Sequence, residues 1–140
     1  PAALAVARGR LGISPSTAGF VLPLGATMNM SGTALYEGCV VLFVAQVFGI
    51  HLDIAQQLTL VFLSVLSAVA VASIPGGSLP LIAGLLVAFG IPPEGIGIIL
   101  GVDRILDMTR TMTNVGADLV TAAIVDSRQG GPALGTSPGS

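Results

Sequence analysis

Charged and polar side chains recur on one face of a long apolar segment near the end of the chain. They are Asp103, Asp107, Arg110, Asn114 and Asp118. At 100° per residue an α-helix places them at about 0°, 40°, 340°, 20° and 60°, within a stripe about 80° wide. A charge at the centre of a membrane helix costs on the order of 2.5 to 3.5 kcal/mol, so the stripe needs a compensating partner or function.

The residue types of the stripe suit the binding of an amino acid and a cation. Arg110 offers a planar fork for a carboxylate, Asp107 can meet an ammonium group, and Asn114 both donates and accepts hydrogen bonds. Asp118 is an oxygen ligand for a small hard cation, and backbone carbonyls freed near Asn29 could complete its shell. Three acids against one arginine leave a negative surplus, which a cation, a proton or an ammonium group would neutralise.

The composition indicates that most of the chain faces lipid or other protein. Of 140 residues, 53% are hydrophobic and 9% are charged, whereas soluble proteins carry about 25% charged residues. The mean hydropathy is +0.95. No basic stripe with interleaved aromatic residues suggests nucleic acid, and the single Cys39 excludes an internal disulfide. Because the chain starts at Pro1 without a signal pattern, we expect a fragment.

The apolar segments and their interruptions predict an all-α membrane protein. A helix over 17–50 would be about 50 Å long, against a hydrocarbon core of about 30 Å, so we expect a helix unwound near 29–32 that lines a polar cavity. The next two apolar stretches, of about 16 and 11 residues, are each too short to span a membrane. Together they predict a re-entrant hairpin over 58–91 with its tip at 75–78. The remaining expected segments are a short helix and turn (1–16), a loop (51–57), a last long helix (92–125) and a disordered tail (126–140).

Three motifs carry a resemblance to a known family. The run LGATMNMSGTALY from Leu24 to Tyr36 resembles the broken seventh helix of the glutamate/aspartate transporter family, whose members are dicarboxylate and amino acid:cation symporters. The turn IPGG from Ile74 is similar to the tip of that family's second hairpin, and GVDRILDMTRTMTNVGAD from Gly101 is similar to its eighth helix. The resemblance covers nearly all of the chain expected to be ordered, with the motifs in the right order.

The resemblance implies roles for individual residues. Arg110 would hold the side-chain carboxylate of aspartate or glutamate, Asp107 the amino group and Asn114 the α-carboxylate. Thr111 and Thr33 would add hydroxyl contacts. The remaining substrate contacts would come from the tip of the second hairpin, namely Ile74, Gly76 and Gly77.

The resemblance also implies two sodium sites and a proton carrier. The first sodium would lie between Asp118, Asn29 and the carbonyls of Gly25 and Asn114. The second would use the Met30 sulfur and four carbonyls, those of Thr27, Ala68, Val69 and Val71. Glu37 resembles the proton-carrying glutamate of the animal carriers, beside the alternative of a buried acid without a transport role. Ser31 stands where the family usually has an aspartate, so proton coupling or fewer sodium ions is expected.

The implied protein is a multi-pass symporter of the cell (inner) membrane, part of an inverted-repeat fold. It would take up acidic amino acids or C4-dicarboxylates with sodium and/or protons by alternating access, with no cofactor beyond these coupling ions. The family's homotrimer would be held by a scaffold domain. Residues 1–16 would then end the first re-entrant hairpin, and the second hairpin would close over the substrate as a gate.

Two other classes compete with this interpretation. A non-transporting membrane subunit would use the stripe only to pair helices, with Arg110 neutralised by Asp107 or Asp103. An enzyme would need a nucleophile paired with a base, and no His, Cys or Lys accompanies the acids. We therefore do not expect an enzyme.

Overall fold

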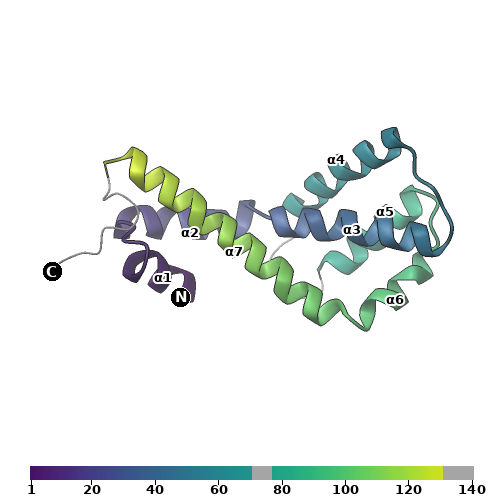
Figure 1. Cartoon of the computed structure of the whole chain (residues 1–140), viewed down its shortest axis with the longest axis horizontal. Coiled ribbons are helices and arrows are strands. Elements are labelled where there is room, and N and C mark those ends of the chain that lie inside the picture. The colour runs from purple at the N-terminus through teal and green to yellow at the C-terminus, as the bar shows by residue number, and fades with distance from the viewer. Residues whose placement is uncertain (71–76, 131–140) are drawn as a thin grey trace. The chain divides into compact units, whose positions relative to one another are not determined.

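The computed structural model of the protein describes residues 1–70 and 77–130, and these residues form helices with no strand among them (Figure 1). The all-α prediction is therefore confirmed for this part of the chain. In chain order the elements are α1 (Ala2–Gly9), α2 (Pro15–Met28), α3 (Ser31–Val47), α4 (Ile54–Ala70), α5 (Ser78–Ala88), the 3-10 helix η1 (Pro93–Gly95), α6 (Ile96–Leu100) and α7 (Asp103–Arg128).

The chain divides into two compact units. We call Pro1–Asn29 with Asn114–Ser140 the terminal unit, and Met30–Thr113 the central unit. Helix α7 contributes residues to both units, so its polar stripe is also divided. Asp103, Asp107 and Arg110 belong to the central unit, whereas Asn114 and Asp118 belong to the terminal unit.

The helical structure is interrupted where a polar run follows Gly25. Helix α2 ends at Met28, and the backbone of Asn29 (φ −95°, ψ 87°) and Met30 (φ −106°, ψ 39°) is not helical. The Asn29 amide still donates to the Gly25 carbonyl at 2.7 Å. The interruption is shorter than the expected 29–32, because Ser31 already opens α3.

The central unit is built around α3, which packs against α4 and α5. Its apolar core consists of Tyr36, Val40, Val41, Val44, Ala45, Leu60, Ile82, Leu85, Leu86, Ile91 and Ile99. Gly95 allows a close approach to α3, because a Cβ there would overlap the Val44 side chain and lie 3.1 Å from the Phe48 ring. This core holds the first part of α7 against α3 through Leu106.

The terminal unit has a smaller core of mostly short side chains, Ala7, Ile13, Ala18, Leu22, Ala122 and Ala123. A polar contact lies beside it. Ser14 caps α2 by accepting from the Thr17 amide, and it donates through its own amide to the Asp126 carboxylate at 3.2 Å and through its hydroxyl at 2.5 Å. Small apolar side chains bury little area, so these polar contacts add to the docking of the end of α7.

Replacing Ser14 with alanine should lower the free energy of unfolding by about 1 kcal/mol, because the cap and the hydroxyl bond to Asp126 are lost together, while the backbone amide bond to Asp126 remains. Thermal unfolding of the full-length protein in detergent would measure this. Ser127→Ala is the matched control, since that hydroxyl bonds only its own helix, at the Ile124 carbonyl. An equal effect of both variants would contradict the role of Ser14.

The same contact makes stability depend on pH. Asp126 lies one residue beyond the predicted span 92–125, and the Ser14 hydroxyl holds the pKa of its carboxyl below the usual range. A lowered pKa means that the contribution is present above about pH 4 and is lost as the pH falls below that value. Ser14→Ala should therefore weaken the dependence of unfolding on pH in this acidic window.

The structure differs from the predicted segments mainly at the carboxyl end. The sequence predicts one helix over 92–125, whereas the structure has η1, α6, a turn at Gly101 and Val102, and then α7 to Arg128. Three glycines within seven residues, at 95, 97 and 101, weaken helix continuity here. The expected hairpin tip at 75–78 and the expected tail lie largely outside the described residues.

Large apolar side chains are exposed along several helices, as expected for contact with lipid or protein. Examples are Phe20, Phe62, Leu58, Ile105 and Met112. In the described part of the chain, the stretch Pro15–Val47 is long and apolar enough to cross a membrane, and two shorter apolar helices are Ile54–Ala70 and Ser78–Ala88.

Candidate functional site

Arg110 is the centre of a polar cluster in the central unit. Its guanidinium is paired with the Asp107 carboxylate one turn earlier on α7, and it donates to the Ser78 hydroxyl at 2.5 Å. The two charged side chains are only 10% and 23% exposed. Ser78 is the first residue of α5. The cluster therefore joins α7 to the start of the helix that follows residues 71–76.

Helix α3 supplies a third side to this cluster. The Arg110 guanidinium lies 5.5 Å from the centre of the Tyr36 ring, and the Tyr36 hydroxyl donates to the Asp103 carboxylate at 2.7 Å. A cation over an aromatic face is attracted by the ring quadrupole. Arg110 is thus oriented by an acid, a hydroxyl and a ring from three different helices.

The other predicted substrate contacts are placed as follows. Thr33 is buried, and its hydroxyl donates to the Met30 sulfur at 3.7 Å. Thr111 is exposed and bonds back to the Asp107 carbonyl at 2.9 Å, so its hydroxyl is used within its own helix. Gly77 precedes α5 as its N-cap. Ile74 and Gly76 lie outside the described residues.

The terminal unit holds the first predicted cation set. Asp118 is 5% exposed, and its carboxylate accepts from the Asn29 side-chain amide at 2.8 Å. A Cβ at Gly25 would lie 2.6 Å from Cγ of Asp118, so the carboxylate rests directly on the backbone of α2. Asn114 lies one turn before Asp118 on α7 and is half-buried. The Asp118 carboxylate and the Asn29 side-chain amide therefore lie together against the backbone near the end of α2.

The second predicted cation set is divided between the units. Thr27 belongs to the terminal unit and is exposed, with its hydroxyl donating to the Leu24 carbonyl at 2.8 Å. Met30 and Ala68 are buried, whereas Val69 is exposed, and all three belong to the central unit. Val71 lies outside the described residues. Within residues 1–70 and 77–130 no three His, Cys, Asp or Glu side chains gather as metal ligands.

Some of these partners could not be assigned from the sequence. The sequence indicates for Ser78 only a place at the end of a turn, whereas in the structure its hydroxyl accepts a hydrogen bond from Arg110. The role of Tyr36 as a support for Arg110 and Asp103 was also missed. The available signal was that Tyr36 is the single tyrosine of an apolar segment, where a buried hydroxyl needs a partner.

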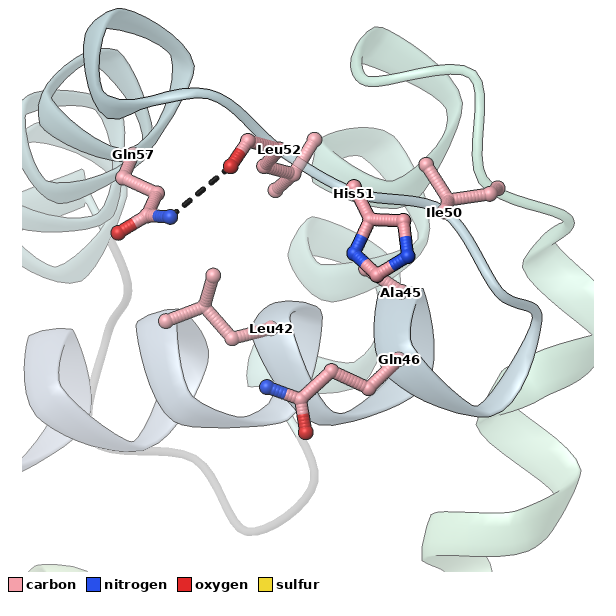
Figure 2. Close-up of a pocket in the computed structure, with 7 residues that line it drawn as sticks. All are labelled: Leu42, Ala45, Gln46, Ile50, His51, Leu52 and Gln57. Carbon is pink, nitrogen blue, oxygen red and sulfur yellow. Dashed lines mark hydrogen bonds between the residues drawn. The ribbon is translucent and has the colours of Figure 1, made fainter.

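A separate small pocket lies at the turn between α3 and α4 (Figure 2). Its volume is about 90 Å³, below the roughly 300 to 1,000 Å³ of typical ligand pockets. The lining residues are Leu42, Ala45, Gln46, Ile50, His51, Leu52 and Gln57. Gln57 is fixed by donating to the Leu52 carbonyl at 2.9 Å. No arginine or lysine lines this pocket, so it does not suit an acidic solute.

Comparison with known proteins gives a family match over most of the chain. The model of the sodium:dicarboxylate symporter family matches residues 1–128. The chain is 37% identical over 121 residues to a proton/sodium-glutamate symport protein of Bacillus subtilis (strain 168), covering 86% of this chain and 28% of that protein. It is 44% identical over 115 residues to excitatory amino acid transporter 2 of Homo sapiens, covering 82% of this chain and 20% of that protein. It is 41% identical over 115 residues to an excitatory amino acid transporter of Caenorhabditis elegans, covering 82% of this chain and 23% of that protein. The chain thus spans less than a third of the length of these relatives.

Proposed function

Because this chain belongs to the sodium:dicarboxylate symporter family, we propose that the full-length protein is a secondary active symporter for acidic amino acids or C4-dicarboxylates. It works in the cell membrane as a multi-pass protein, by alternating access, and is driven by sodium and/or protons. Its relatives include a proton/sodium-glutamate symport protein and an excitatory amino acid transporter, which supports this substrate class.

One observation carries the proposal, namely the guanidinium of Arg110 held in a fixed orientation among apolar helices. Asp107, Ser78 and the Tyr36 ring orient it. A carboxylate of the substrate can take the place of the Asp107 or Ser78 contact, because the planar fork accepts two parallel hydrogen bonds. Asp107 is then available for the amino group of the substrate.

The remaining substrate contacts follow from the family. Asn114 would bind the α-carboxylate, and hydroxyls of Thr111 and Thr33 would add contacts. The backbone near Ile74, Gly76 and Gly77 would close over the substrate as the tip of a re-entrant hairpin over 58–91. Residues 1–16 would end the first hairpin, and 17–50 and 92–125 would contribute the transmembrane helices of the core.

Sodium is the proposed coupling ion at Asp118. The packing of its carboxylate on Gly25 and its bond to Asn29 support a small oxygen-lined site that Asn114 would complete. A second sodium would use Thr27, Met30, Ala68, Val69 and Val71.

Proton coupling is the second part of the proposal for the driving ions. Ser31 is exposed at the start of α3 and stands where the family usually has an aspartate. Because serine offers no carboxylate to a third sodium, fewer than three sodium ions are coupled. Glu37, which is fully buried, is the proposed proton carrier. In the assembled protein three copies would be held together by a scaffold domain.

Isotope uptake by the full-length protein in liposomes tests the function. Labelled aspartate, glutamate and succinate are supplied with a sodium gradient, a proton gradient, both or neither. Uptake of at least one of the three should require one of the gradients, and no uptake under any gradient would contradict the proposal. Uptake driven by protons alone would overturn the sodium assignments at Asp118 and Met30 but keep the symporter.

A non-transporting structural subunit is the alternative, and one observation favours it. Arg110 already has a charged partner and a hydroxyl partner within the chain, so the cluster could serve only to join α5 and α7. The isotope assay separates the two functions, because a non-transporting subunit should show no uptake under any gradient.

A further inference from the structure

Four buried oxygen atoms of the central unit have no hydrogen-bond partner among the described residues. They are both carboxyl oxygens of Glu37 and the hydroxyl oxygens of Ser64 and Ser67. Most buried polar groups in proteins are hydrogen-bonded, so each exception needs an explanation. Here the exceptions occur together on two packed helices, α3 and α4.

The contacts place the two serines of α4 against the part of α3 that carries Glu37 and Gly38. A Cβ on Gly38, the residue after Glu37, would lie 3.7 Å from the Ser64 hydroxyl. The Ser67 hydroxyl is close enough to the Glu37 carboxyl to interact with it, although their geometry is not that of a hydrogen bond. Ser64 and Ser67 are three residues apart and therefore share one face of α4. Both hydroxyls thus lie on the face of α4 that packs against α3 near residues 37 and 38.

The charges around Glu37 do not compensate an ionised carboxylate. Its side chain is 0% exposed. Helices α4 and α5 carry no charged residue, and the basic group that acts on Glu37 is Arg110, which is already paired with Asp107. Asp103 accepts a hydrogen bond from Tyr36 and adds a further negative charge to this part of the central unit. A buried carboxylate without a partner costs so much that the group takes up a proton instead.

A protonated carboxyl fits two serine hydroxyls chemically. It has one donor and one acceptor, and each hydroxyl can donate one hydrogen bond and accept others. A small rotation of the side chains, or one bridging water, would satisfy all four oxygens. The same hydroxyls would also donate to the carboxylate while a proton leaves it.

We propose that Ser64 and Ser67 are positioning residues whose hydroxyls donate to the ionised form of Glu37 and so set how tightly this buried acid holds its proton, which links the packing of α4 on α3 to proton release and binding. The proton comes from water and bonds one carboxyl oxygen. When α4 separates from α3, water reaches the carboxyl and accepts the proton back. The inference rests on the proposed role of Glu37 as a proton carrier. It adds that the arm of the second hairpin, through its two hydroxyls, sets when that proton is held.

The test uses the full-length protein and two readouts. The first is the substrate KM in exchange experiments between pH 5 and 9. The second is the number of protons taken up when substrate is added to weakly buffered protein in detergent. The variants are Glu37→Gln and the double variant Ser64→Ala with Ser67→Ala. Thr59→Val is the control, because this exposed hydroxyl of α4 bonds only the Ala55 carbonyl of its own helix.

The double variant should keep a pH profile but shift its midpoint upward by about one pH unit. Without the hydroxyls the carboxylate loses its donors, so the neutral form is favoured and the proton is held about tenfold more tightly. Glu37→Gln should abolish both the pH dependence and the proton uptake, and Thr59→Val should change neither.

Each other outcome has a distinct meaning. If the double variant leaves the midpoint unchanged while Glu37→Gln abolishes the profile, the serines do not position Glu37, but its carrier role stands. If Glu37→Gln leaves the profile and the proton uptake intact, the carrier role is wrong and the inference is wrong with it. Should Glu37→Gln fail to fold, the midpoint shift of the double variant and its proton uptake still decide the role of the serines.

Discussion

Replacing Arg110 with alanine in the full-length protein is expected to lower the uptake of acidic amino acids about 100- to 4,000-fold. The variant removes the one fork on the stripe that can bind a carboxylate, and it leaves Asp107 without its charged partner. Breaking a buried charge pair costs about 3 to 5 kcal/mol, which corresponds to this range at 1.4 kcal/mol per tenfold. Competition by neutral amino acids would show whether binding of other solutes survives.

Three further variants separate a substrate role from a structural one. Arg104→Ala removes an exposed arginine of the same helix and should leave uptake unchanged. Arg110→Lys keeps the charge without the fork and should remain strongly impaired. The double variant Asp107→Ala with Arg110→Ala leaves no unpaired charge, so a purely structural pair predicts recovery of uptake. Such recovery would contradict the substrate role of Arg110.

Replacing Gly25 with alanine is expected to raise the sodium concentration for half-maximal uptake by about ten- to a hundredfold. The new Cβ would lie 2.6 Å from Cγ of Asp118, closer than two carbon atoms can approach. The carboxylate must move away from the backbone of α2 and from the Asn29 amide that binds it. A displacement of about 1 Å at a binding group can cost about a hundredfold.

Gly116→Ala is the matched control for this experiment. It lies on α7 two residues before Asp118, and a Cβ there meets nothing within 4 Å. The sodium dependence of this variant should equal that of the natural protein, and its helix should be slightly more stable. An unchanged sodium dependence in Gly25→Ala would show that the contact between Gly25 and Asp118 does not belong to a coupling site.

The division of the chain into helices was largely accessible from the sequence. The polar run after Gly25 predicts an interruption, and the structure has non-helical backbone at Asn29 and Met30. The division between α6 and α7 at Gly101 was missed, because apolar character continues across the glycines while helix propensity falls. Hydrophobic pattern reports burial along a segment, whereas helix ends depend on local backbone preferences that the pattern does not register.

The stripe of α7 shows a similar limit for the candidate sites. The 3.6-residue period already places Asp103, Asp107, Arg110, Asn114 and Asp118 on one face. It does not reveal that the first three belong to the central unit and the last two to the terminal unit. That division depends on which other helices pack against each part of α7.

The sequence by itself determined the composition suited to a membrane, the motifs of the family and the spacing of the charged residues. These are local properties, fixed by residue type and by the geometry of a helix. Only the tertiary structure decided that Ser78 and Tyr36 orient Arg110, that Gly25 receives the Asp118 carboxylate, and that two serines of α4 lie against the part of α3 that carries Glu37. These partners come from different helices, and packing of apolar side chains, rather than any local pattern, brings them together.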